Sequence, residues 1–167
     1  MSGHSADSMR VIEGHGSAAE LRVSLIVSRY HDFVTDRLQA GALAALADAG
    51  VDESHVTVVR VPGAFEIPLA AHRAAASGQF GAVVCLGCIV RGETPHFEYL
   101  ASAVSHALAD ASVTTGVPLT FGVLTTNSIE EAIERAGDGP ANKGWEAAVA
   151  AVELAAVVAQ LGRPRKQ

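Results

Sequence analysis

Four short apolar runs alternate with segments of helical periodicity along the chain, and this alternation constrains the fold more than any other feature of the 167 residues. The runs cover residues 21–28, 56–61, 82–90 and 119–126. Strands that are apolar on both sides are typical of parallel sheets covered by helices on both faces. The order therefore predicts an α/β fold, a three-layer sandwich in which helices flank a four-stranded parallel sheet.

Two of the predicted helices have clear ends. Residues 31–48 carry apolar residues at helical spacing and stop before Gly50, and residues 67–77 stop before Gly78. Glycine is common just after a helix because it adopts the left-handed backbone conformation without strain.

The remaining helices follow the third and fourth runs. Thr94 and Pro95 have the residue types preferred at the N-cap and first position of a helix that is expected to run to about residue 115. Ser128-Ile129-Glu130-Glu131 has the form of a capping box and predicts a short helix ending at Gly137. A last helix is expected over about 141–161.

Composition indicates one domain with a sufficient core, since hydrophobic residues make up 49% and charged residues 18% of the chain. We expect a flexible N-terminal extension over residues 1–20, a single domain over 21–162 and a C-terminal tail over 163–167. The extension has no apolar stretch of the kind found in signal peptides.

The net charge of −6 comes from 12 basic and 18 acidic residues, with no basic cluster that could replace the counterions of nucleic acid. No later apolar run looks long enough and free enough of charge to span a bilayer. We therefore expect a cytoplasmic protein with neither a nucleic-acid nor a membrane partner.

The last predicted helix carries a single polar stripe, formed by Glu146, Glu153 and Gln160 at intervals of seven residues. The rest of its surface is Ala, Val and Leu, which is typical of a helix buried on most sides. Contact with another subunit would bury it, so a homo-oligomer is expected. The alternative is that the Ala-rich surface is merely neutral.

Cys85 and Cys88 have the spacing of a redox pair, but they lie inside an apolar strand rather than at a helix start. Positions three apart on a strand point to opposite faces, so the two sulfurs should diverge. Both cysteines are interpreted as buried, reduced and hydrophobic.

Ligands of open parallel sheets bind at the carboxyl ends of the strands. The segment that follows the third run is the richest in chemistry, because Arg91, Gly92 and a helix start favour an anion and His96 could act as a base. Singly, each has an ordinary structural explanation; together they indicate an enzyme acting on a phosphorylated small molecule. The four segments at strand ends are 29–31, 62–66, 91–97 and 125–127.

Two rings also lie at these strand ends. Tyr30 and Phe65 could hold a flat heterocycle by stacking, or they could simply close the end of the core. Metal-ligand spacing, a G-x-G-x-x-G fingerprint and a G-x-S-x-G elbow are absent from the sequence, and Lys143 precedes its glycine rather than following one.

Several stretches resemble the lumazine synthase (6,7-dimethyl-8-ribityllumazine synthase) family in order and spacing. The resemblance extends from about residue 21 to the last helix. It implies a flavodoxin-like fold and condensation of 5-amino-6-(D-ribitylamino)uracil with 3,4-dihydroxy-2-butanone 4-phosphate in riboflavin biosynthesis, without metal or organic cofactor. The matching stretches are Val61–Pro68, Leu86–Tyr99, Phe121–Thr126, Ile133–Gly137 and Asn142–Gly144.

The resemblance also implies residue roles. His96 would transfer protons, and the phosphate would be held by Gly92, Glu93, Thr94 and Arg135. The pyrimidine and its ribityl chain would contact Tyr30, His31, Gly63, Ala64, Phe65, Glu66, Cys88, Ile89, Val90, Phe121 and Lys143. Of these residues, Phe121, Arg135 and Lys143 would come from an adjacent subunit.

Family members form pentamers, in some cases packed as twelve pentamers into a 60-subunit shell, and riboflavin synthase is a further partner that the resemblance suggests. Tyr30 stands where Phe or Trp is usual in the family, and His31 stands where Asn is frequent. The stretch 135–143 has the common length but contains Asp138 and Pro140, which would alter contacts between pentamers. The alternatives are an archaeal-type riboflavin synthase, which the phosphate-binding stretch disfavours, and a non-catalytic flavin or lumazine carrier, which His96 and Arg135 disfavour.

Overall fold

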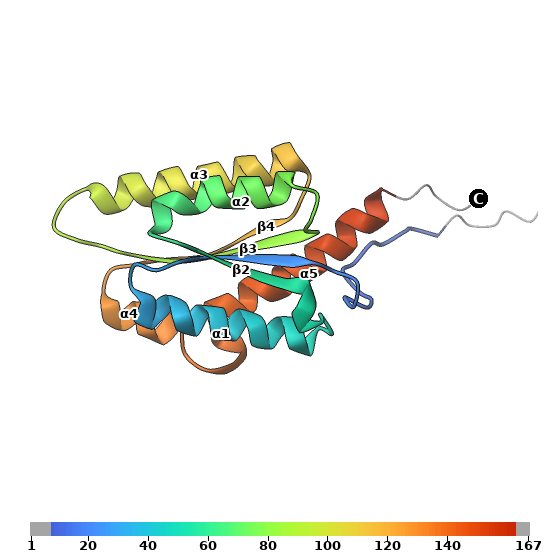
Figure 1. Ribbon diagram of the computed structural model, residues 1–167, viewed down its shortest axis with the longest axis horizontal. Helices are drawn as coiled ribbons and strands as arrows, with labels where there is room; N and C mark the ends of the chain where they lie inside the picture. The colour runs from blue at the N-terminus through green and yellow to red at the C-terminus, as the bar shows by residue number, and fades with distance from the viewer. Residues whose placement is uncertain (1–7, 163–167) are drawn as a thin grey trace, which may run out of the picture.

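A computed structural model describes residues 8–162, which form three layers around a parallel sheet (Figure 1). The four strands have the spatial order β2-β1-β3-β4, and every neighbouring pair is parallel. The predicted α/β sandwich with a four-stranded parallel sheet is confirmed. The strands are β1 (Val23–Ser28), β2 (Val56–Val61), β3 (Ala82–Val90) and β4 (Leu119–Thr126).

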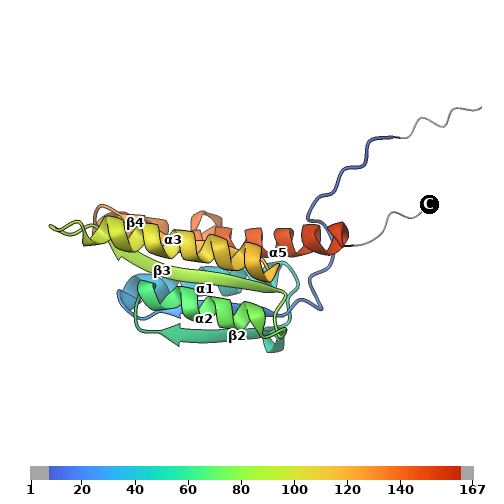
Figure 2. The ribbon, with the colours of Figure 1, turned by 90° about the horizontal axis from the view of Figure 1, so that it is seen from above.

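The helices divide between the two faces of the sheet, as Figures 1 and 2 show. One face is covered by α1 (Asp32–Asp48), α4 (Ile129–Arg135) and α5 (Lys143–Leu161), and the other by α2 (Ile67–Ala76) and α3 (His96–Thr115). Because both faces are covered, β1 is buried along its whole length and β3 along nearly all of it. The edge strands β2 and β4 are partly exposed.

The alternation of side chains along β3 separates the two cysteines. Cys85 belongs to the hydrophobic cluster under α2 and α3, and Cys88 to the cluster under α1 and α5. Both are free and buried, so the predicted divergence of the sulfurs is confirmed.

The glycines predicted to follow α1 and α2 have the expected conformation. Gly50 has a φ of 87° and Gly78 a φ of 74°, in the left-handed region where a side chain would be strained. Ser128 caps α4 as predicted, since its Oγ accepts a hydrogen bond of 3.2 Å from Glu131 N–H.

Two predicted helix ends are wrong. The helix α3 begins at His96 with Pro95 at its N-cap and no side-chain cap, so Thr94 lies one residue outside the helix. The physical reason is that the Pro95 carbonyl is the first acceptor of the helix, bonding Glu98 N–H at 3.0 Å. The helix α4 ends at Arg135 rather than Gly137, because the chain then turns toward α5.

The helix α5 also corrects an expectation. Within the described part of the chain, it is long and apolar enough to cross a membrane by length and composition, although no such run was expected. One side packs on the sheet and α1 through the small residues Gly144, Ala147, Ala148 and Ala151. Leu154, Val158 and Leu161 remain exposed.

The polar stripe of α5 contacts the segment that precedes β1. Gln160 Nε2 donates a hydrogen bond of 2.7 Å to the Glu13 carbonyl, and Gly14 lies against the backbone of Glu153. Residues 1–7 and 163–167 lie outside the described residues. These include the whole of the predicted C-terminal tail and part of the predicted N-terminal extension, so the proposed domain limits stay a prediction.

Candidate active site

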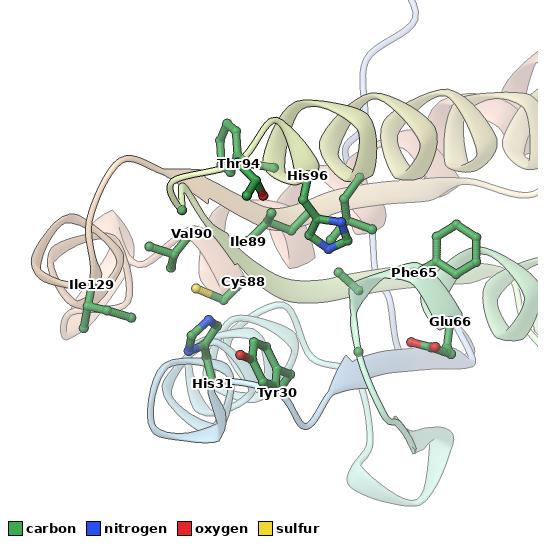
Figure 3. A pocket seen from close by; sticks show the side chains of 15 residues that line it. Tyr30, His31, Phe65, Glu66, Cys88, Ile89, Val90, Thr94, His96 and Ile129 are labelled. Atoms are coloured by element: carbon green, nitrogen blue, oxygen red, sulfur yellow. The ribbon is translucent and has the colours of Figure 1, made fainter.

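The segments that follow β1, β2 and β3 meet at the carboxyl edge of the sheet and enclose a cavity of about 790 Å³ (Figure 3). A volume of this size is typical of small-molecule sites. We call it the first cavity. It is lined by Tyr30, His31, Gly63, Ala64, Phe65, Glu66, Cys88, Ile89, Val90, Gly92, Thr94, His96, Phe97, Leu100 and Ile129.

One wall is formed by Tyr30 and His31, whose side chains lie beside each other in Figure 3. Their ring centroids are 4.4 Å apart, and Tyr30 is 68% exposed. Tyr30 N–H donates to the Pro62 carbonyl at 3.0 Å, which ties the end of β1 to the loop after β2. A large ring left uncovered at the mouth of a cavity is available to stack on a flat ligand.

His31 makes the turn between β1 and α1 possible. Its φ of 60° is the one positive value found at a non-glycine residue among residues 8–162, and it occupies the N-cap of α1. Partial burial lowers the pKa of His31 below its ordinary value of 6.5, which favours the neutral imidazole. His31 therefore presents a neutral donor and acceptor to the cavity near pH 7.

Cys88, Ile89 and Val90, at the end of β3, form the inner wall of the first cavity. Burial raises the pKa of Cys88 to about 11, so the sulfur is a neutral thiol. A neutral thiol beside two aliphatic side chains makes this wall apolar, and it suits the face or edge of a heterocycle.

The loop after β3 brings His96 to the cavity at the first position of α3. The space around Gly92 is open, since a Cβ built there would meet no atom within 4 Å. The N-terminal end of a long helix carries free N–H groups and partial positive charge. An anion and a proton-transferring imidazole can therefore be accommodated together.

Arg91 connects this loop to its surroundings. Its Nε donates to Asn127 Oδ1 at 3.0 Å, and its guanidinium lies 4.8 Å from the centre of the Phe97 ring. Glu98 Oε1 is 3.4 Å from Arg91 Nη1. Asn127 N–H in turn donates to Glu131 Oε2 at 3.0 Å, so the loops after β3 and β4 are linked by polar contacts.

A second cavity of about 530 Å³ lies along the exposed edge of β4, between β4 and α5. Phe121, Arg135, Lys143 and Glu146 are among its lining residues, and Phe121 is 47% exposed. Lys143 Nζ is 2.8 Å from Glu146 Oε2. The second cavity thus combines an uncovered ring with two cations.

The structure divides the sixteen predicted site residues between these places. Twelve line the first cavity, while Phe121, Arg135 and Lys143 line the second and Glu93 lies exposed in the loop without lining either. Sequence reasoning included Phe97 in the segment 91–97 without giving it a role, and it did not place Leu100 or Ile129 at the site. Two signals could have found them. Leu100 is four residues after His96, on the same face of a helix, and Ile129 follows closely after the fourth strand.

Within the part of the chain that the structure describes, no three His, Cys, Asp or Glu side chains are grouped so that they could hold a metal ion. The charged and titratable side chains of the first cavity are instead two imidazoles and Glu66 beside the helix N–H groups, and those of the second cavity are Arg135, Lys143 and Glu146. This set can bind an anion and move protons.

Comparison with known proteins agrees with this chemistry. Residues 20–159 match the family model described as 6,7-dimethyl-8-ribityllumazine synthase. A protein of Syntrophus aciditrophicus (strain SB), described as 6,7-dimethyl-8-ribityllumazine synthase, is 50% identical over 151 residues, which cover 90% of this chain and 98% of that protein. The chain therefore belongs to the 6,7-dimethyl-8-ribityllumazine synthase family.

Proposed function

We propose that the first cavity of one subunit and the second cavity of a neighbouring subunit together form the active site of this enzyme. The chain is a 6,7-dimethyl-8-ribityllumazine synthase, an enzyme of riboflavin biosynthesis. Its substrates in this proposal are 5-amino-6-(D-ribitylamino)uracil and 3,4-dihydroxy-2-butanone 4-phosphate. The observation that carries the proposal is the separation of His96 and Arg135 into two cavities, each of which holds only part of the required chemistry.

The pyrimidine would lie in the first cavity, with its face on Tyr30 and its edge along the backbone of Cys88, Ile89 and Val90. The exposed ring of Tyr30 and the apolar wall of β3 suit a flat heterocycle. The ribityl hydroxyls would then meet Glu66 and neutral His31, which offer both hydrogen-bond acceptors and donors.

The phosphate ester would lie at the start of α3. Gly92 leaves open space, Thr94 lines the cavity, and the helix N–H groups favour an anion. Arg135 from the neighbouring subunit would supply the positive charge that the lining of the first cavity lacks, since a guanidinium can bind two phosphate oxygens at once. Glu93, between Gly92 and Thr94 in this loop, would be a further contact of the phosphate.

The reaction needs proton transfers at successive steps. The 5-amino nitrogen attacks the ketone carbon and a water molecule leaves to form an imine. Loss of the proton on C3 and departure of phosphate with the electron pair of its C4–O bond leave an enol, which becomes a ketone at C3 by proton transfer. The ribityl-bearing nitrogen attacks this carbonyl carbon, and loss of a second water molecule closes the ring. His96 is placed to take and return these protons, while positioning of the two reactants supplies a large part of the acceleration.

A ring of identical subunits would place each second cavity against the first cavity of the next subunit. The exposed apolar side chains of α5 and Phe121 support an assembled rather than a monomeric enzyme. We infer that the assembly is a pentamer; twelve pentamers in a 60-subunit shell and association with riboflavin synthase extend this proposal. We also infer a cytoplasmic location, in which the two free cysteines stay reduced.

The direct test mixes the protein with both substrates and follows the absorbance and fluorescence of the lumazine. Formation of product well above the uncatalysed rate is expected. An uncatalysed rate in the presence of assembled protein would contradict the enzymatic function and favour a carrier.

A second test addresses the shared site. His96→Ala damages the first cavity and Arg135→Ala the second, so co-refolding equal amounts of the two variants creates some interfaces with two intact halves. Random mixing predicts that about a quarter of the sites regain wild-type composition, so kcat/KM for the phosphate ester should recover to about a quarter of the wild-type value. A mixture no more active than the mean of the two variants would show that the site lies within one chain.

A further inference from the structure

The side chain of Asn142 makes four hydrogen bonds. Its Oδ1 accepts from Gly144 N–H at 2.8 Å and from Trp145 N–H at 3.2 Å. Its Nδ2 donates to the Gly137 carbonyl at 2.8 Å and to the Arg37 carbonyl at 3.1 Å. With 3% of its surface exposed, Asn142 is buried and both ends of its amide have partners.

Two glycines allow α1 and α5 to approach each other closely at this amide. A Cβ built on Gly41 of α1 would overlap the Asn142 amide, and one built on Gly144 of α5 would overlap the Leu38 carbonyl. Gly41 lies in the interior of α1, where glycine costs about 1 kcal/mol relative to alanine, and Gly144 is the second residue of α5. The close approach of α1 and α5 at Asn142 therefore depends on glycine at both positions.

Asn142 also closes the loop that separates the two cations of the second cavity. Arg135 is the last residue of α4 and Lys143 the first of α5, and both line that cavity. Within the loop, Asn142 N–H donates to the Gly139 carbonyl at 3.0 Å, while Nδ2 holds Gly137. The bond to Arg37, 105 residues away in sequence, fastens the closed loop to α1.

A helix cap alone would not need this arrangement. Ser128 caps α4 with a single acceptor, and the Oδ1 of Asn142 performs the same task for α5. The Nδ2 bonds are additional, and they act on the loop rather than on the helix.

We propose that Asn142 is a positioning residue, whose Nδ2 bonds to Gly137 and Arg37 fix the placement of Arg135 and Lys143 toward the substrates. The inference rests on the proposed function, in which these two cations act at the active site of the neighbouring subunit. Asn142 touches neither substrate and works through the loop that it closes.

The test uses Asn142→Asp and Asn142→Ser in the assembled enzyme. Both replacements keep an oxygen that can cap α5 and remove the Nδ2 donors. We expect the KM for the phosphate ester to rise about tenfold and the KM for the pyrimidine to rise as well, because both cations shift. The kcat should fall no more than about twofold, since His96 lies in the other cavity.

Ser112→Ala is the matched control for loss of stability. Ser112 Oγ donates to the Val117 carbonyl and accepts from Leu119 N–H, so it too joins a helix end to another segment, at the opposite end of β4. We expect this variant to lower Tm by a few degrees without changing either KM. If the Asn142 variants lower Tm and leave both KM values unchanged like the control, the proposal is overturned.

Arg135→Ala and the double variant with Asn142→Asp distinguish a failure of the proposed function from a failure of the role proposed for Asn142. The second substitution should add little to the KM of Arg135→Ala for the phosphate ester, because the group that it positions is gone. An unchanged KM in Arg135→Ala would contradict the proposed function. A raised KM in Arg135→Ala together with a wild-type KM in both Asn142 variants would overturn only the role of Asn142. If the Asp variant does not assemble, the Ser variant decides.

Discussion

Arg91 Nε donates a hydrogen bond of 3.0 Å to Asn127 Oδ1, and this bond joins the loop after β3 to the loop after β4. The two residues are 36 positions apart in sequence and come from neighbouring parallel strands. Because the loop after β3 carries Gly92, Thr94 and His96, the geometry of the first cavity depends on a contact made outside its lining.

Asn127→Ala removes the acceptor of Arg91 and should loosen that loop. We expect the KM for the phosphate ester to rise about threefold with little change in Tm, because the bond is exposed and contributes about 1 kcal/mol or less to folding. Steady-state kinetics and thermal unfolding measure the two quantities. Gln39→Ala is the control, since Gln39 Oε1 accepts an exposed bond from Arg60 and neither residue lines either cavity. Equal KM values in the two variants would contradict the prediction.

Arg135→Ala should raise the KM for the phosphate ester about thirtyfold, as expected for loss of a charge-assisted hydrogen bond worth about 2 kcal/mol. The KM for the pyrimidine should change less. Arg73→Ala, which removes a cation from the last turn of α2, serves as the control and should behave like the wild type. A wild-type KM in Arg135→Ala would place the anion site elsewhere.

His96→Ala should lower kcat about a hundredfold while the KM values stay near those of the wild type. The loss is expected to be incomplete, because holding two reactive partners together still accelerates their condensation. His106→Ala on the same helix is the control, since the His106 ring is hydrogen-bonded to Ser102 outside the first cavity. A wild-type kcat in His96→Ala would remove His96 from proton transfer.

His31→Asn should change how stability depends on pH. Burial lowers the pKa of His31 in the folded state below 6.5, so the unfolded state binds more protons as the pH falls below that value. The wild type should therefore lose free energy of unfolding relative to His31→Asn below about pH 6.5, with a constant difference above pH 7. Asn tolerates the left-handed conformation of residue 31, so α1 should be retained. Urea unfolding between pH 5 and 8 measures the difference, and a constant difference throughout would contradict the assignment.

The two thiols should be unreactive in the folded enzyme. Burial raises the pKa of Cys88 to about 11 and that of Cys85 to about 12, so almost no thiolate forms at pH 7. Alkylation by iodoacetamide should be slow at pH 7, rise toward pH 10, and occur at Cys88 before Cys85 because Cys88 lines the first cavity. Mass spectrometry of digested protein identifies the modified residue. Rapid labelling of Cys85 in folded protein would contradict this order.

Whether a feature of the fold could be predicted depends on how far apart in sequence the interacting residues lie. The element order could be predicted because apolar period and glycine positions are local signals, as at Gly50 and Gly78. The start of α3 could not, because Thr94 is a common cap residue and nothing local indicates that the Pro95 carbonyl opens the helix instead. The expectation that no apolar run is long enough to span a bilayer was wrong for α5. Small residues that pack on a sheet give a helix the same composition as a membrane-spanning helix.

The α/β layering and the residues that follow each strand could be predicted from the sequence, since both depend on the pattern of neighbours along the chain. The resemblance implied that Arg135 comes from an adjacent subunit, but the two separate cavities that hold His96 and Arg135 are a feature of the folded chain. That separation accompanies the strand order β2-β1-β3-β4, which leaves β4 at an edge, with Phe121, Arg135 and Lys143 lining the second cavity along that strand. It is maintained by contacts such as that of Asn142 with Arg37, which join positions too distant in sequence for any local pattern to predict.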